Sequence, residues 1–196
     1  MSRLPIYLYG TEVLRKKAKP VQKLDDSTIK LMYDLAETMQ KANGIGLAAT
    51  QVGDLRRMLV VDVGAIERGA RDEDEGKVPE HESQSKVLVM MNPEIRESEG
   101  TIAMEEGCLS IPDLRAEVER PEKITVKYRD VNFEETEITA DGLLARVIQH
   151  EADHLDGIMF VDRIGKTRRA LLRTDLKKIE KGEVDTSYPT ISTDEV

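Results

Sequence analysis

The feature that most constrains this chain is a pair of histidines, His150 and His154, with Glu151 directly after the first. Apolar residues recur at helical spacing from Leu144 to Leu155, after Asp141-Gly142, and this pattern predicts a helix that ends before Gly157. Residues four apart on a helix lie on one face, so both imidazoles can bind one metal ion. Glu151 would stand beside that ion as a proton carrier. We expect this apolar helix to lie at the centre of the fold.

Two other interpretations of the histidine pair need no catalysis. Both rings could be core histidines bonded to carboxylates, or they could belong to a structural zinc site, which normally has four protein ligands. Outside the helix, the only candidate ligands of comparable affinity are Cys108 and His81. His81 lies between two glutamates in a charged segment and is expected to face solvent. Cys108 as third ligand would leave one position open for water, as in a catalytic site.

A metal ion with an open position is suited to hydrolysing an amide. The ion lowers the pKa of its bound water and polarises a carbonyl, while Glu151 takes the water's proton and later delivers it to the leaving amine. The helix motif alone points first to an HExxH-type metallopeptidase, whose usual third ligand is a downstream Glu or His. No histidine follows His154, and Glu180 and Glu183 lie in a basic helix or just after it. The third ligand is therefore expected from upstream, where Cys108 is the obvious donor.

Length and composition limit the class of protein. With 196 residues, the chain has the size of one compact unit, and we expect a single catalytic domain over residues 1–182. No apolar run of about eighteen residues predicts a membrane span, and the N-terminus lacks the apolar core of a secretory signal. The single cysteine fits a reducing cytoplasm. A net charge of −9 argues against nonspecific nucleic-acid binding by the surface as a whole.

Periodicity and turn residues predict an α+β fold. One helix follows the N-cap candidates at residues 25–27 and ends at Asn43-Gly44, and another covers residues 168–181. Short strands are expected at residues 57–63, 87–91, 116–119, 124–128 and 133–138. Asn92-Pro93 should end the second of these strands. The expected architecture is mostly antiparallel short strands in small sheets, packed around the central metal-binding helix, with a C-terminal helix.

Three segments stand out by their charge. Residues 64–86 are charged and poor in apolar side chains, which predicts an exposed loop. Residues 183–196 are rich in Asp, Thr and Ser and are expected to form a disordered tail. The helix at residues 168–181 is basic, although the chain as a whole has a net negative charge. A helix face exposed to solvent is a simpler explanation of this basic charge than a binding surface.

Three motifs carry a resemblance to a known family. They are residues 44–51 (GIGLAATQ), 106–110 (EGCLS) and 149–154 (QHEADH). In this order they resemble the three signature motifs of peptide deformylases, and the resemblance spans roughly residues 4–180. It implies removal of the formyl group from N-formylmethionine on newly made proteins, with release of formate. A metallopeptidase and a non-enzymatic metal-binding module are the alternatives.

The resemblance also implies roles for individual residues. Glu151 would be the general base and acid, and Gln51 and the backbone N–H of Leu109 would stabilise the tetrahedral oxyanion. Loss of one such donor typically costs about 10²–10³ in rate. The metal ligands would be Cys108, His150 and His154. The methionine pocket and the peptide backbone would be handled by Ile45, Gly46, Glu106, Arg115, Leu143 and Val147.

Cofactor and partners follow from the same resemblance. The family's metal is commonly ferrous iron, although zinc, nickel or cobalt can occupy such a site, and thiolate and imidazole ligands do not decide among them. Formylmethionyl nascent peptides would be the substrates. The local charge of the basic helix at residues 168–181, together with the emergence of formylated chains at the ribosome, suggests a transient contact with the ribosome. We expect a cytoplasmic protein with no membrane and no specific nucleic-acid partner. Arg146 stands at a pocket-side position where some members carry an apolar residue, and a side chain pointing away from the pocket would explain it.

Overall fold

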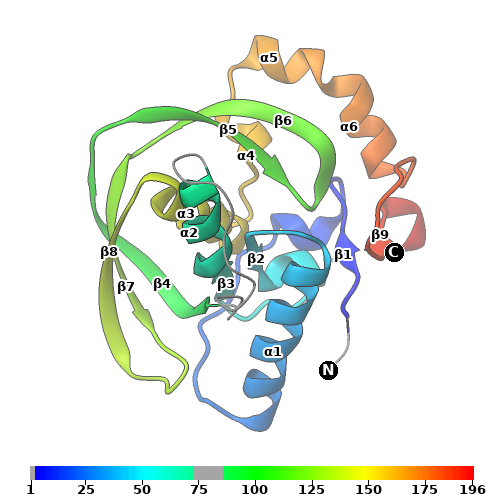
Figure 1. Cartoon of the computed structure of the whole chain (residues 1–196). Coiled ribbons are helices and arrows are strands. Elements are labelled where there is room, and N and C mark those ends of the chain that lie inside the picture. Colours follow the sequence, from blue (N-terminus) through cyan, green and yellow to red (C-terminus); the bar gives the residue numbers. More distant parts are fainter. Residues whose placement is uncertain (1–2, 73–85) are drawn as a thin grey trace.

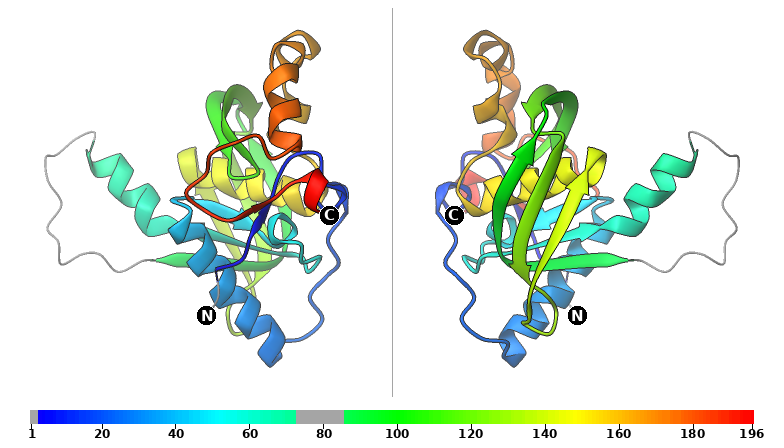
Figure 2. Two further views of the ribbon diagram at one scale, coloured as in Figure 1. Left: turned by 90° about the vertical axis from the view of Figure 1, so that its right-hand side faces the viewer. Right: turned by 90° about the vertical axis from the view of Figure 1, so that its left-hand side faces the viewer.

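The strand at the centre of the fold is buried on both of its faces. In the computed structural model of the chain, which describes residues 3–72 and 86–196, every residue of β3 (Met58–Asp62) is buried. Its alternate side chains join two different apolar clusters, one with helix α1 (Asp26–Lys41) and the other with helix α3 (Gly142–Leu155). Successive side chains of a strand point to opposite faces, so the two helices cover opposite faces of one sheet (Figure 1, Figure 2).

Within the described residues, the strands form three sheets. The largest is antiparallel and runs in the order β2 (Gly46–Ala48), β3, β4 (Val87–Glu99), β7 (Lys123–Arg129) and β8 (Glu135–Asp141). A separate antiparallel hairpin consists of β5 (Ile102–Cys108) and β6 (Ile111–Arg120). The two chain ends form a parallel pair, β1 (Ile6–Tyr7) with β9 (Thr190–Ile191). The predicted α+β class, with small and mostly antiparallel sheets around a central helix, is confirmed.

Shorter helices connect and cover these sheets. The α-helices among them are α2 (Val63–Asp72), α4 (Phe160–Arg163), α5 (Lys166–Leu171) and α6 (Arg173–Glu180). The 3-10 helices are η1 (Glu12–Arg15), η2 (Ala49–Val52) and η4 (Thr193–Glu195). Over residues 3–72 and 86–196, no helix combines the length and the apolar character that crossing a membrane would require.

Local capping explains where α1 begins and ends. The side chain of Asp25 accepts a hydrogen bond from the N–H of Thr28 (3.0 Å), which satisfies one of the free donors of the first turn. At the other end, Asn43 adopts a left-handed φ of 54°, and the N–H of Gly44 donates to the carbonyl of Met39 (2.9 Å). The predicted start and end of this helix are confirmed.

Strand β4 continues through the point where the sequence predicts its end. The expected stop at Asn92-Pro93 is wrong, and the pairing of β4 with β7 instead shifts register between Met91 and Glu94. The Asn92 side chain accepts a hydrogen bond from the N–H of Val21 (2.7 Å) and donates one to the carbonyl of Val21 (2.9 Å). These bonds hold a bulge that interrupts the pairing without ending the strand.

The segment predicted to be a loop over residues 64–86 begins as a helix. The side chain of Asp62 accepts a hydrogen bond from a backbone N–H in the first turn of α2 (2.8 Å) and so caps the helix. Val63 and Ile66 lie partly buried against the apolar cluster around α3. Their spacing gives α2 an apolar edge that a count of charged residues does not reveal. Residues 73–85 of the predicted loop lie outside the described residues.

The C-terminal part differs from expectation in two ways. The single helix predicted over residues 168–181 consists of two helices, α5 and α6, that meet at Leu172. Residues 183–196, expected to be a disordered tail, fold back to the N-terminus, where the N–H of Ile6 donates to the carbonyl of Pro189 (2.9 Å). Backbone pairing of this kind depends little on side-chain polarity, so composition alone does not reveal it.

A third apolar cluster holds the β5–β6 hairpin beside α3. Buried side chains of β6 pack there with those of α4 and α6. Phe160 of α4 is fully buried, and its ring stacks on His150 with centroids 6.2 Å apart. This packing places Cys108, the last residue of β5, next to the histidines of α3.

Gly157 ends α3 in a conformation that an L-residue tolerates poorly. Its φ is +74°, and an added Cβ would lie 2.5 Å from the carbonyl oxygen of Arg15. We expect Gly157→Ala to lower the free energy of unfolding by about 3 kcal/mol, from left-handed strain and backbone overlap together. Gly142→Ala is the matched control, because Gly142 has φ +51° but open space around the added Cβ, and about 1 kcal/mol is expected there. Denaturant titration measures both, and equal losses would contradict the overlap.

Candidate metal centre

Three side chains with metal-binding donor atoms converge at the end of the β5–β6 hairpin. The Sγ of Cys108 lies 3.2 Å from the Nε2 of His154, which in turn lies 3.2 Å from the Nε2 of His150. The ligand atoms of all three residues lie within 4.8 Å of one another. The structure therefore brings together the three residues predicted to be metal ligands, whereas His81 lies outside the described residues.

The geometry and chemistry of these donors fit a single metal ion. Ligand atoms bound tetrahedrally at about 2.0–2.3 Å lie roughly 3.3–3.6 Å from one another. The Cys108–His154 and His154–His150 separations, both 3.2 Å, are close to this value. Thiolate and imidazole are ligands that suit zinc, iron, nickel and cobalt alike. The sulfur and the two imidazole nitrogens face one another across a single point. A cation between them would satisfy all three.

Glu106 orients the ring of His150. Its Oε2 lies 2.8 Å from Nδ1 of His150. Although burial opposes ionisation, hydrogen bonds from Arg120 and His150 hold the pKa of Glu106 well below its usual range. An ionised carboxylate only accepts hydrogen bonds, so Nδ1 carries a proton and Nε2 faces the cluster. Burial disfavours charge on His150, but its hydrogen bonds to Cys108 and Glu106 raise its pKa to about 10, so the negative partners around this ring suit a cation.

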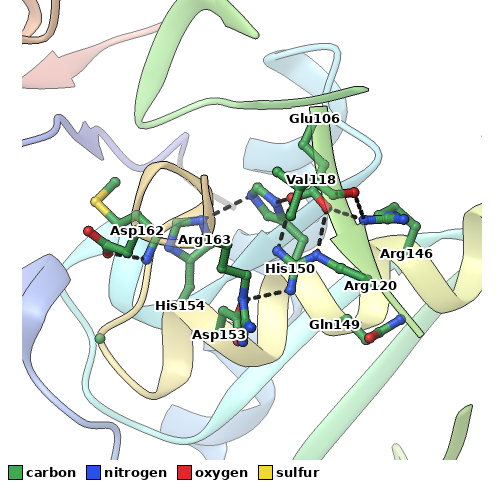
Figure 3. Close-up of polar contacts among 12 residues, drawn as sticks. Glu106, Val118, Arg120, Arg146, Gln149, His150, Asp153, His154, Asp162 and Arg163 are labelled. Carbon is green, nitrogen blue, oxygen red and sulfur yellow. Dashed lines mark hydrogen bonds and ion pairs between the residues drawn. The ribbon is translucent and has the colours of Figure 1, made fainter. Parts of the chain in front are cut away.

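Glu106 is in turn held by buried charge. Arg120 donates from Nε and Nη2 to the two oxygens of Glu106 (2.6 and 2.9 Å) and from Nη1 to Asp153 (2.6 Å). Arg163 of α4 pairs with Asp153 from the other side. Figure 3 shows these groups along one side of α3. Charges of alternating sign thus tie the hairpin, α3 and α4 to one another.

Arg146 joins the same network. The residue is 3% exposed, and Nη1 donates to Glu106 Oε1 (2.9 Å) and to the carbonyl of Val118 (2.8 Å). Nη2 donates to the carbonyl of Ile102 (2.6 Å). The guanidinium therefore anchors both strands of the hairpin to α3 (Figure 3). Glu106, which was predicted as a substrate contact, lines the pocket, and Arg120, Arg146 and His150 engage both of its oxygens.

Gln51 points its amide nitrogen at the cluster. The N–H of Ala48 donates to Gln51 Oε1 (2.8 Å), which fixes the orientation of the amide. Nε2 then lies 3.2 Å from the hydroxyl of Ser110 and 3.5 Å from Sγ of Cys108. The side chain is buried in η2. Its N–H group is thus held beside the candidate metal position, where the predicted oxyanion donor belongs.

Glu151 lies directly against the backbone of β2. A Cβ added at Gly46 would lie 2.5 Å from Glu151 Oε1 and 2.7 Å from Val147 Cγ1, so the close approach requires glycine. Burial raises the pKa of the Glu151 carboxyl to about 7, with His150 opposing the rise. Among the described residues, Oε2 of Glu151 has no hydrogen-bond partner. This oxygen is free to bond a water molecule or a substrate.

The cluster opens into a pocket of about 640 Å³. Ile45 and Leu143 line it with side chains that remain 38% and 40% exposed, although both are large and apolar. The structure places every predicted substrate and catalytic residue on the pocket lining, namely Ile45, Gly46, Gln51, Glu106, Leu109, Arg115, Leu143, Val147 and Glu151. Two of the three candidate ligands, Cys108 and His150, also line it.

One part of the pocket lining was not predicted from the sequence. Residues 185–188 line it from the C-terminal segment that was expected to be disordered. Tyr188, the only aromatic residue of that segment, packs partly buried against the cluster around α1. An aromatic residue in an otherwise polar tail is the one sequence signal that could have identified this segment as a folded part.

Sequence comparison agrees with the geometry. The polypeptide deformylase family matches residues 3–170. The peptide deformylase of Salinibacter ruber is 46% identical over 98% of this chain and 96% of its own length. The peptide deformylase of Chlorobium phaeobacteroides is 46% identical over 95% of this chain and 94% of its own.

Structural comparison agrees as well. The crystal structure of a peptide deformylase from Legionella pneumophila matches with a TM-score of 0.78 and 38% identity, covering 93% of this chain and 98% of that one. A peptide deformylase from Ehrlichia chaffeensis in complex with actinonin matches with a TM-score of 0.78 and 35% identity, covering 94% of this chain and 100% of that one. With near-complete coverage in sequence and in structure, the chain belongs to the polypeptide deformylase family.

Proposed function

We propose that this chain removes the formyl group from the N-terminal formylmethionine of newly synthesised proteins and releases formate. The observation that carries the proposal is the convergence of Cys108, His150 and His154 on one point beside Glu151, in a member of this family. A metallopeptidase is not favoured, because the third donor comes from the upstream hairpin and the relatives are peptide deformylases.

Peptide deformylases are metal-dependent, and we assign the ion to Cys108, His150 and His154. When bound, it would supply a Lewis acid for the formyl carbonyl and lower the pKa of water. Glu151 takes a proton from the attacking water and returns it to the leaving amine, which its unpartnered Oε2 supports. Gln51 Nε2 and the Leu109 N–H donate to the developing oxyanion.

The apolar side of the pocket suits the methionine side chain. We assign Ile45, Leu143 and Val147 to this contact, since the first two expose large apolar side chains in a pocket beside Glu151. Gly46 allows the substrate backbone to lie close to Glu151. We assign Arg115, exposed on the pocket rim, to the peptide backbone. Glu106 acts through His150 instead of contacting substrate, because its oxygens are already engaged.

The proposal predicts a narrow substrate choice. Formyl-Met-Ala-Ser should be deformylated, whereas acetyl-Met-Ala-Ser and internal peptide bonds should stay intact, because the crowded site admits only the small formyl group. Glu151→Ala should keep its metal and lose about 10²–10⁴-fold in kcat. Exposed Glu117 on β6 provides the matched control, Glu117→Ala, with unchanged turnover. Release of formate and metal content are the measurements. Cleavage of the acetyl peptide, or full turnover without Glu151, would refute the assignment.

We further propose that the cellular metal is Fe²⁺, with Zn²⁺, Ni²⁺ or Co²⁺ able to replace it in a purified sample. A thiolate-bound ferrous centre is sensitive to oxidation of the metal or the sulfur. Protein prepared with iron without air should therefore lose activity in air, while nickel- or cobalt-loaded protein should keep it. Formate release and metal content by mass spectrometry follow both. Full activity after a strong chelator has removed all metal would contradict metal dependence.

We also propose a transient contact with the ribosome in the cytoplasm, where formylated chains emerge, and the basic surface of α5 and α6 is the feature that supports this proposal. Arg168 and Arg173 are exposed there. Co-sedimentation with ribosomes should weaken steeply as salt is raised, and the double variant Arg168→Glu, Arg173→Glu should reduce it at low salt. The control reverses two exposed lysines elsewhere, Lys16→Glu and Lys19→Glu, with the same change in net charge. Equal effects of both pairs would rule out a specific contact through α5 and α6.

A further inference from the structure

The C-terminal segment reaches the candidate active site. Asp185, Thr186, Ser187 and Tyr188 line the same pocket as Glu151. The hydroxyl of Tyr188 donates to the backbone carbonyl of Leu109 at 2.9 Å. Residue 109 lies directly after Cys108, in the turn that joins β5 to β6. A segment beyond the family match at residue 170 thus contacts the turn that carries the proposed oxyanion donor.

Several bonds fix this segment in place. The parallel pair β1–β9 follows Tyr188 directly, and the N–H of Leu8 donates to the carbonyl of Ile191 (2.8 Å). Arg3 donates to the carbonyl of Ser187, and the hydroxyl of Thr186 donates to the carbonyl of Tyr188 (2.8 Å). The position of the Tyr188 hydroxyl is therefore set by pairing with the N-terminal strand.

The same turn is held from two other directions. The N–H of Tyr9, just after β1, donates to the carbonyl of Ser110 (2.9 Å). The hydroxyl of Ser110 accepts a hydrogen bond from Gln51 Nε2 (3.2 Å). Leu109 and Ser110 are thus anchored by the N-terminal strand, by η2 and by the C-terminal segment. Of these anchors, only Tyr188 bonds to Leu109 itself, and it does so through a side-chain hydroxyl. Substitution by phenylalanine removes this hydroxyl and nothing else.

We infer that Tyr188 is a positioning residue for deformylation, which it serves by holding the backbone of Leu109 so that the Leu109 N–H faces the oxyanion. The inference rests on the proposed function. The N–H and C=O of Leu109 flank one Cα, so fixing the carbonyl restricts rotation of the N–H. Preorganised donors are effective because they need no reorientation during the reaction. Burial raises the pKa of Tyr188 to about 12, so the phenol keeps the proton that it donates.

Tyr188→Phe tests the inference, because it removes the hydroxyl and keeps the ring packing. We expect kcat for formyl-Met-Ala-Ser to fall about 10-fold while KM changes less than about twofold, since the donor acts mainly in the transition state. Amide hydrogen exchange should become faster in a peptide that spans residues 105–112 and nowhere else. Metal content should not change. Tyr33→Phe is the matched control, because Tyr33 is 53% exposed on α1, and neither measurement should change there.

The possible outcomes distinguish failure of the Tyr188 positioning role from failure of the proposed deformylase function. Normal turnover in Tyr188→Phe, with an active parent protein, would overturn the role of Tyr188 and leave the proposed function standing. A parent protein without deformylation would overturn both. A fall in kcat with faster exchange throughout the molecule would identify a general stability effect and would also overturn the positioning role. A local change in exchange with a selective fall in kcat supports it.

Discussion

The buried carboxylate of Glu106 is the contact on which the site depends most. It accepts hydrogen bonds from an arginine of β6 and from an arginine and a histidine of α3. Burying so much charge is costly, and removing one partner of such a set typically destabilises a protein by about 3–5 kcal/mol. The set is tolerated because its charges alternate in sign and because Arg146 also satisfies two backbone carbonyls of the hairpin. Specific orientation of His150 is what this arrangement provides.

That orientation matters because the three donors come from two independent elements. The histidines are placed by helix geometry alone, but Cys108 lies on a hairpin that shares no sheet with β3. Apolar packing against α4 and α6 brings the hairpin near α3, and packing is not directional. Hydrogen bonds from Arg120 and Arg146 fix its position relative to the helix. The hydroxyl of Thr50 links η2 to the end of α3, since it donates to the carbonyl of His154 (3.0 Å).

The sequence predicts well those parts of the structure that depend on residues close together in the chain. Spacing of four places His150 and His154 on one face, and Asp25 and Gly44 mark the ends of α1 by capping chemistry. Cys108 follows because it is the one thiol in the chain. Non-local causes escape such an argument. In sequence, Asn92 before Pro93 is a stop signal for a strand, and only its hydrogen bonds to the distant residue Val21 make it part of a bulge. The partners of Arg146 on β5 and β6 are equally invisible.

Composition misleads most at the C-terminus, and the reason is physical. Polar side chains predict disorder because a segment with few apolar groups cannot offset its conformational entropy by burial. Residues 183–196 need little burial of their own apolar side chains, because β1 supplies backbone hydrogen-bond partners. In addition, the carbonyl of Leu109 accepts a hydrogen bond from the Tyr188 hydroxyl. The partly buried Val184 and Tyr188 are sufficient apolar anchors in that setting. A terminal segment that folds against an ordered site is held in place by partners outside the segment. Its own composition therefore predicts less ordered structure than the segment has.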